Sequence, residues 1–222
     1  MNNFDKFDID KKIIFVDCFN TVVLRNKSRN CVFKNWAIDA SKFLGISWKN
    51  FYKVYKKVNF WLCFRKIFSR FVLQEKFSVV LDKMYYKLLK RYRDLDKTKF
   101  LSTALNCYIK SEMESHKVCQ EFVDFLKKLK NNGAKIYIVS DFYCNSSDIE
   151  KWIKNLRIDD LFAKIFSSCD YEKEKSTCGL YKKLLQELNI DKRDVVMIGD
   201  NIWSDVLMAR LCGIKAFRIK FD

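Results

Sequence analysis

Four polar side chains in this sequence each follow a short apolar segment. Asp17 follows "IIFV", Ser140 ends "KIYIVS" and Asp200 follows "VVMIG". Lys175 lies in the loop after a fourth segment, "KIFSS". Any one of them alone is more typical of a helix cap, a turn or a solvated surface than of an active site. Their arrival in order after apolar segments indicates one site at which carboxylates, a hydroxyl and an ammonium group meet a ligand.

The apolar segments themselves are typical of buried parallel strands, because they are short and rich in β-branched residues. The predicted strands are Ile13–Asp17, Lys135–Ser140, Ala163–Ser167, Asp194–Gly199 and Lys215–Ile219. Helical patterns alternate with them over Ser115–Lys130, with Ser115 as the expected N-cap, and over Ser147–Leu156, Thr177–Leu188 and Ser204–Leu211. This alternation predicts an α/β protein with a Rossmann-like, three-layer parallel sheet core.

A long segment separates the first predicted strand from the second. Between Thr21 and the helix expected at Ser115 lie over ninety residues without a clear strand pattern. The helices expected there are Phe33–Leu44, Trp48–Phe71, Glu75–Arg93 and Lys99–Ile109. The predicted organisation is therefore a core made of residues 1–24 and 113–222, with a helical cap, residues 25–112, inserted over the carboxyl edge of its sheet.

Four segments resemble, in order, the four motifs of the haloacid dehalogenase-like (HAD) superfamily of hydrolases. They are "FVDCFNT", "YIVSD", "EKSTCG" and "IGDNIWSD". The first two are further similar to a subgroup whose motifs read D-x-F-D-T and S-D-M-Y, and whose members often accompany surface-polysaccharide genes. The resemblance covers the outer parts of the chain, and the long insert matches the helical cap that many members carry.

The resemblance implies an Mg²⁺-dependent hydrolase of a small phosphate ester, with a sugar phosphate as one candidate substrate. Asp17 would be the nucleophile that forms an aspartyl-phosphate, and Lys175 would neutralise the charge that develops there. The residues implied at the metal are Asp17, Phe19 through its carbonyl, Asp200 and Asp205, the last of which would brace a metal-bound water or Lys175. The candidate contacts to the phosphate or the rest of the substrate are Asn20, Thr21, Ser140, Asp141 and Arg25.

Phe19 is where the sequence departs from the phosphatase pattern. HAD phosphatases have an aspartate there, which protonates the leaving oxygen and then activates water, a contribution of roughly 10²–10⁴-fold. Three alternatives stay open, in this order: a weakly active phosphohydrolase; a phosphotransferase or a non-catalytic binder of anions or nucleic acid; and a dehalogenase. Asp200 and Asp205 argue against the dehalogenase, because halide displacement at carbon needs no Mg²⁺.

The net charge of +16 on 222 residues is concentrated in the predicted cap. Residues 22–116 hold 21 Lys and Arg against 7 Asp and Glu, whereas the rest hold 22 against 20. Within the cap, residues 51–71 interleave aromatic and basic side chains. Packing of the aromatics with solvated lysines explains this pattern, and so does binding of a phosphorylated substrate, an anionic membrane or single-stranded nucleic acid. Nucleic acid is not favoured, because no nucleic-acid motif is recognisable.

The nine cysteines are scattered and contain no CxxC pair, which disfavours a zinc knuckle and a disulfide framework. This pattern favours a reduced compartment. The first residues, "MNNFDKFDIDKK", contain no apolar signal-peptide region, and no apolar run approaches the roughly 18 residues of a membrane span. We therefore expect a cytoplasmic protein without a membrane span.

Overall fold

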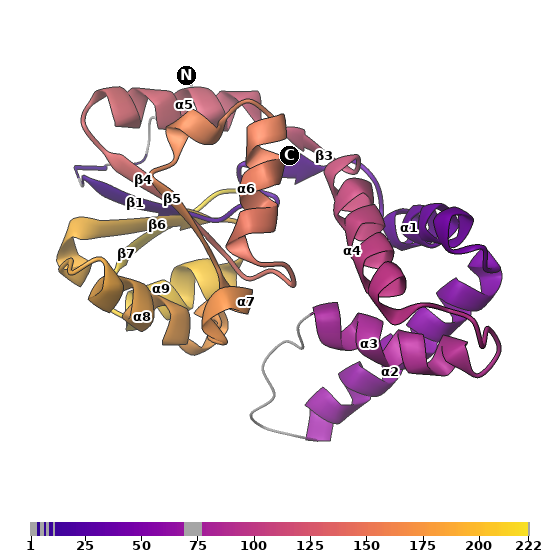
Figure 1. Cartoon of the computed structure of the whole chain (residues 1–222). Helices are drawn as coiled ribbons and strands as arrows, with labels where there is room; N and C mark the ends of the chain where they lie inside the picture. Colours follow the sequence, from indigo (N-terminus) through magenta and orange to yellow (C-terminus); the bar gives the residue numbers. More distant parts are fainter. Residues whose placement is uncertain (1–3, 5–6, 8, 11, 69–76, 222) are drawn as a thin grey trace. The chain divides into compact units, whose positions relative to one another are not determined.

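The computed structural model describes residues 4, 7, 9–10, 12–68 and 77–221. The chain forms two compact units (Figure 1). Residues 1–25 and 117–222 make up the first, here called the core unit, and residues 26–116 make up the second, the cap unit.

The core unit contains a five-stranded sheet in the order β5-β4-β1-β6-β7. The strands are β1 (Ile13–Val16), β4 (Lys135–Ser140), β5 (Lys164–Ser167), β6 (Val195–Gly199) and β7 (Lys215–Arg218). All neighbours pair in parallel, and Val16 lies beside Ile138 of β4 on one side and Ile198 of β6 on the other. Because β1 is central, its carboxyl end meets the carboxyl ends of β4 and β6.

Helices cover both faces of this sheet. They are α5 (Gln120–Asn131), α6 (Ser146–Asn155), α7 (Ser168–Tyr171), α8 (Gly179–Glu187) and α9 (Met208–Leu211). Figure 1 shows α5 on one face and α8 and α9 on the opposite face. Phe15 packs with Leu180 and Leu184 of α8, whereas Ile14 and Val16, which are also buried, alternate to the other face. The predicted three-layer α/β core is confirmed.

The helix predicted to begin at Ser115 begins later. The short strand β3 (His116–Val118) pairs with β2 (Val23–Arg25), and α5 starts only at Gln120. The Ser115 hydroxyl donates back to the Glu112 carbonyl at 2.8 Å, and the residues that follow it form a strand, so Ser115 does not precede a helix. Beside the paired strands, the Asn26 amide donates to the Ser115 carbonyl at 2.8 Å. The first and last residues of the cap unit therefore lie next to each other.

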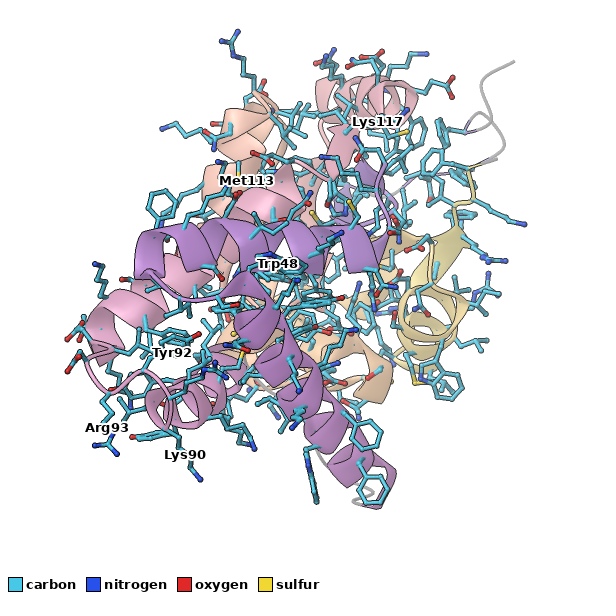
Figure 2. All side chains as sticks on the ribbon, turned by 90° about the vertical axis from the view of Figure 1, so that its right-hand side faces the viewer. Trp48, Lys90, Tyr92, Arg93, Met113 and Lys117 are labelled. Carbon is cyan, nitrogen blue, oxygen red and sulfur yellow. The ribbon has the colours of Figure 1, made fainter. Side chains whose placement is uncertain are left out.

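The cap unit consists of α1 (Arg29–Leu44), α2 (Trp48–Phe68), α3 (Phe77–Leu89) and α4 (Lys97–Met113). The ends predicted at Phe71 and Glu75 lie outside the described residues. Ser28 and Asp96 accept amide hydrogen bonds at the starts of α1 and α4, and Gly45 ends α1 with a φ of 65°. Figure 2 shows the course of α2 from Trp48, and the side chains of Lys90, Tyr92 and Arg93 beyond the end of α3.

Trp36 forms the centre of the cap unit's hydrophobic core. Its indole is fully buried and packs against Phe51, Tyr55 and Tyr108 at ring-centroid distances of 4.9, 5.2 and 5.8 Å. The indole N–H donates to the Ala104 carbonyl at 2.7 Å, so its polar atom is satisfied. Among the described helices, none combines the length and the apolar character needed to cross a membrane.

Candidate active site

Asp17 lies directly beyond β1 at the carboxyl edge of the sheet. Its amide donates to the Ile198 carbonyl of β6 at 2.9 Å, so the strand ladder reaches the residue itself. The chain then turns sharply, with Asn20 at a φ of 55°, a left-handed conformation that asparagine tolerates better than most residues. The carboxylate is only 7% exposed. A buried strand therefore presents a desolvated acid at the sheet edge.

Lys175 is buried beside this acid. Its ammonium group donates to Oδ1 of Asp17 at 2.6 Å and lies 2.7 Å from Oδ1 of Asp205. The backbone of Lys175 is held as well, because both carboxylate oxygens of Asp141 accept its amide N–H, at 3.0 and 3.2 Å. Two carboxylates thus fix the side chain of this lysine, and a third fixes its main chain.

Asp200 and Asp205 lie in the loop and wide helical turn that follow β6. The Asn201 side chain accepts the amides of Trp203 and Ser204, which begins the turn Ile202–Leu207. The Asp205 carboxylate is fully buried and accepts from the Asn201 amide at 3.0 Å and the Ser204 hydroxyl at 3.2 Å. The acid is therefore held in one orientation.

Gly199 allows this arrangement. A Cβ atom at position 199 would overlap the Asp205 carboxylate, so a larger residue would displace it. The requirement for glycine here comes from close approach rather than from an unusual φ.

Three carboxylates converge at this edge of the sheet. Asp17, Asp200 and Asp205 each offer an oxygen atom, and these atoms lie within 4.8 Å of one another. Carboxylate oxygens are the ligands that hard divalent cations prefer. One lysine cannot neutralise three carboxylates, so the charge and the donor atoms of this group both suit a divalent cation.

Burial controls the protonation of this group. It raises the pKa of Asp17 to about 7, an effect that Lys175 opposes and Asp205 reinforces. Burial also raises the pKa of Asp141 and of Asp200. For Lys175, burial works to lower the pKa, but the attraction of Asp17 and Asp205 outweighs it and raises the pKa well above the usual range. Such clusters of perturbed groups are typical of functional sites.

Two hydroxyl groups near the strand ends have unused hydrogen-bonding capacity. Thr21 and Ser140 are fully buried, and within the part of the chain that the structure describes their hydroxyl oxygens have no hydrogen-bond partner. Since buried polar groups are nearly always paired, this indicates that a ligand or water completes them. Arg25, by contrast, ends β2 and takes no part in the contacts described above.

Phe19 belongs to an aromatic group in the core unit. Its ring is half-buried. The ring centroid lies 4.3 Å from that of Phe142, in the loop after β4, and 5.1 Å from that of Trp152 in α6. The position two residues after Asp17 therefore contributes apolar packing and no ionisable group.

Sequence reasoning overlooked three residues that shape this site. Gly199 makes room for Asp205, Asn201 caps the turn that carries it, and the Tyr181 hydroxyl donates to the Ser204 carbonyl at 2.9 Å. The capping role of Asn201 has a sequence signal, since asparagine before a helical segment is a strong N-cap. The Tyr181 contact joins residues 23 positions apart, and the Gly199 contact depends on the path of the turn after β6, so neither is evident from a local pattern.

The core unit is therefore a Rossmann-like α/β protein with a lysine–carboxylate group at the carboxyl edge of its parallel sheet. Residues 11–213 match the family described as haloacid dehalogenase-like hydrolase. The chain belongs to this family.

Two curated relatives are similar to part of the chain. Both are glyceraldehyde 3-phosphate phosphatases, from Pyrococcus abyssi and Pyrococcus furiosus, and each is 31% identical over 99 residues. The matched region is 43% of this chain and 40% or 39% of the relative, so the chain spans less than half the length of either.

Solved structures share the fold over nearly the whole chain. A HAD hydrolase from Bacillus subtilis, YfnB, bound to magnesium, has a TM-score of 0.60 at 17% identity, covering 94% of this chain and 88% of that one. A 2-haloacid dehalogenase from Pseudomonas syringae pv. Tomato has a TM-score of 0.63 at 13% identity, covering 96% and 90%. At these identities the likeness concerns the fold alone.

Proposed function

We propose that this chain is an Mg²⁺-dependent phosphohydrolase that acts on a small phosphorylated substrate. The observation that carries the proposal is the buried Asp17 carboxylate, 2.6 Å from the Lys175 ammonium group and grouped with Asp200 and Asp205. The phosphatase names of the two Pyrococcus relatives support a phosphate ester, and their substrate makes sugar phosphates the first compounds to test.

In the proposed reaction, a carboxylate oxygen of Asp17 attacks phosphorus while the bond from phosphorus to the leaving oxygen breaks. The product is an aspartyl-phosphate, from which water then releases phosphate. Lys175 neutralises negative charge on the nucleophile and on the transferring group. The hydroxyls of Thr21 and Ser140, which lack partners among the described residues, donate to phosphoryl oxygens.

The metal would be held by carboxylate oxygens and one carbonyl. The proposed set is Asp17, Asp200, Asp205 and the carbonyl of Phe19. When bound, Mg²⁺ supplies positive charge beside the phosphoryl oxygens. Asp205 already accepts hydrogen bonds from Asn201 and Ser204, so its main role is to keep its neighbours oriented.

Because position 19 holds a packed aromatic ring and no acid, we expect slow turnover. The same feature suggests a second candidate function. Without an acid at position 19, the leaving oxygen takes its proton from solvent or from the substrate itself. Hydrolysis of the aspartyl-phosphate likewise lacks a general base from this position. An acceptor alcohol bound in place of water would make the same site a phosphotransferase. The cluster of Asp17, Asp200 and Asp205 argues against a dehalogenase, since displacement of halide from carbon needs no cation.

A phosphatase screen tests the proposal. Purified protein is assayed with Mg²⁺ against a panel of sugar phosphates and other small phosphate esters. We expect measurable phosphate release by the wild type, and its loss in Asp17→Asn, which keeps the shape of the side chain but removes the nucleophile. Removal of Mg²⁺ with a chelator should abolish the same activity.

The matched control is Asp124→Asn, the same chemical change at an exposed position of α5. It should retain wild-type activity. Equal turnover in Asp17→Asn and in the wild type would overturn the assignment of the nucleophile. If the wild type is inactive across the whole panel, including assays with added alcohol acceptors, the proposal of an enzyme would give way to that of a phosphate-binding protein.

A further inference from the structure

The aromatic side chains of α2 divide into two groups. In its first half, Phe51 and Tyr55 are buried against Trp36, whereas Trp48 and Tyr52 are half-buried. Further along the described part of α2 the aromatic side chains are exposed. Phe60 is 67% exposed, Trp61 61% and Phe64 44%. These three residues, here called the aromatic ridge, form a continuous surface, since the rings of Phe60 and Trp61 each lie 6.3 Å from that of Phe64. Packing among the described residues of the cap unit leaves these three rings largely exposed.

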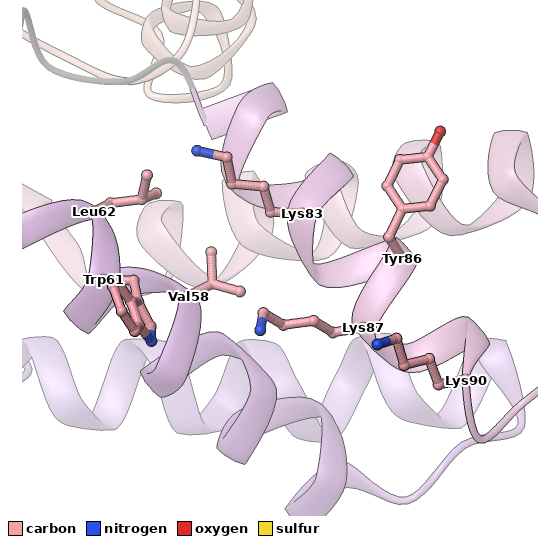
Figure 3. A pocket seen from close by; sticks show the side chains of 7 residues that line it. All are labelled: Val58, Trp61, Leu62, Lys83, Tyr86, Lys87 and Lys90. Carbon is pink, nitrogen blue, oxygen red and sulfur yellow. The ribbon is translucent and has the colours of Figure 1, made fainter. Parts of the chain in front are cut away.

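A pocket of about 390 Å³ adjoins the ridge, between α2 and α3 (Figure 3). Val58, Trp61 and Leu62 line it from α2, and the first and last of these are nearly fully buried aliphatic residues. The lining from α3 and the residue just beyond its end is Lys83, Tyr86, Lys87 and Lys90. Figure 3 shows the three lysines directed toward the α2 side of the pocket. An apolar floor is thus bordered by ammonium groups.

Positive charge on this surface is not balanced by acids of α2. The sequence of α2, Trp48–Phe68, contains no acidic residue. Asp82 of α3 pairs with Lys97 at 2.7 Å, so this acid does not neutralise Lys87 or Lys90 of the pocket. The surface therefore combines large exposed apolar groups with a net positive charge, and it complements a partner that is both anionic and apolar.

We propose that the aromatic ridge and the pocket lysines bind the surface of an anionic lipid bilayer. Aromatic side chains would enter the boundary between headgroups and acyl chains, and the lysines would lie among anionic headgroups. A small phosphorylated substrate requires only the lysines and leaves the exposed rings unexplained. Single-stranded RNA could stack on the rings, but its binding does not require the aliphatic floor of Val58 and Leu62.

The test is co-sedimentation of the full chain with vesicles. Neutral vesicles of phosphatidylcholine are compared with vesicles that also contain phosphatidylglycerol. We expect binding to the anionic vesicles and little to the neutral ones. Binding should weaken strongly at about 1 M salt, where the screening length falls to about 3 Å.

Two variants separate the apolar part of the surface from its charge. Replacing the ridge by Phe60→Ala, Trp61→Ala and Phe64→Ala together should weaken vesicle binding by at least about tenfold, because interfacial affinity follows the apolar area inserted. The pair Lys87→Gln and Lys90→Gln should lose about fivefold per lysine, from the roughly 1 kcal/mol that each basic residue contributes near an anionic surface. The matched control is Phe43→Ala, a 67% exposed phenylalanine of α1 that should bind like the wild type.

Circular dichroism checks that each variant keeps its helices. Failure of the wild type to bind anionic vesicles would overturn the proposal, and so would equal binding by the ridge variant and the wild type. Tight binding of an oligouridylate that the ridge variant loses, without any vesicle binding, would assign the surface to nucleic acid instead. All of these results are independent of the phosphatase assay, because none of the altered residues belongs to the proposed active site.

Discussion

The residue at position 19 determines which proton-transfer group the proposed site lacks. Phe19 packs with Phe142 and Trp152, so its ring stabilises the fold around the nucleophile without offering a proton. The proposed metal contact at this position is a backbone carbonyl, which any residue supplies. A change of side chain at position 19 therefore alters proton transfer separately from metal binding.

Phe19→Asp should increase phosphate release. A carboxyl group there could protonate the leaving oxygen and then activate water, steps worth up to roughly 10²–10⁴-fold. We expect at least about a tenfold rise in kcat, because the loss of aromatic packing offsets part of the gain. The measurement is steady-state kinetics at saturating Mg²⁺, with Phe19→Ala as the control that loses the ring without adding an acid. A kcat for Phe19→Asp no higher than that for Phe19→Ala would show that proton transfer does not limit turnover.

Single residues at strand ends were the most predictable part of the candidate site. The sequence order of Asp17, Lys175 and Asp200 predicts their approach, because parallel strands end at one edge. The hydrogen bonds from the Lys175 amide to Asp141 were not predictable, since they join two loops 34 residues apart in the chain. Asp141 was expected to contact substrate, and its placement beneath Lys175 adds a supporting contact that spacing alone could not reveal.

At the scale of elements, the turn that follows β6 depends on the absence of a side chain at Gly199. The turn brings Asp205 back over the strand end, and a Cβ atom at position 199 would occupy its space. The sequence element "IGDNIWSD" thus owes its geometry to its glycine as well as to its acids.

Gly199→Ala should destabilise the protein by about 1–3 kcal/mol, the usual cost of forcing an extra carbon into a packed site. It should also weaken Mg²⁺ binding, because the displaced Asp205 loses its contacts with Lys175 and Asn201. Denaturant unfolding and isothermal titration with Mg²⁺ measure the two effects. In an Asp205→Ala background the added carbon should cost less, since the overlapping group is gone. An equal cost in both backgrounds would contradict this explanation.

The five strands of the parallel sheet were predictable to within one residue at each end, because buried parallel strands are short apolar runs, whereas β2 and β3 were not predicted. The helices were less so. The predicted helix Thr177–Leu188 is interrupted at Cys178, which has a φ of 60°, and the predicted Ser204–Leu211 is a wide turn, Ile202–Leu207, followed by α9. Pairing of β3 with β2 replaced the predicted helix start at Ser115. In each case a tertiary contact or a site geometry overrode the local pattern.

At the scale of the whole molecule, each of the two compact units contains a hydrophobic core of its own. One is built around Phe15 and α8, and the other around Trp36 in the cap unit. The long strandless segment of the sequence predicts a helical insert in the region of the second core. Because the two cores share no residues, a substitution in one core should lower the stability of its own unit and leave the other unit unchanged.

Trp36→Ala should destabilise the cap unit by about 3–5 kcal/mol, because it leaves a large cavity among Phe51, Tyr55 and Tyr108. Trp36→Phe is the matched control. It keeps an aromatic ring but removes the hydrogen bond to Ala104, at a smaller cost. Hydrogen exchange followed by mass spectrometry should show faster exchange in α1 and α4 of Trp36→Ala, with β1, β4 and β6 unchanged. Equal acceleration in the sheet would mean that the two cores unfold as one.

The hydrogen bond from Asn26 to Ser115 has a consequence for the history of such a protein. The chain leaves the core unit and returns to it at adjacent residues, so a short linker could close the gap at little cost in loop entropy. A segment inserted or exchanged between these two points leaves the strand that carries Asp17 uninterrupted. Recombination at two neighbouring positions can therefore give the same core unit a different helical unit in a single genetic event.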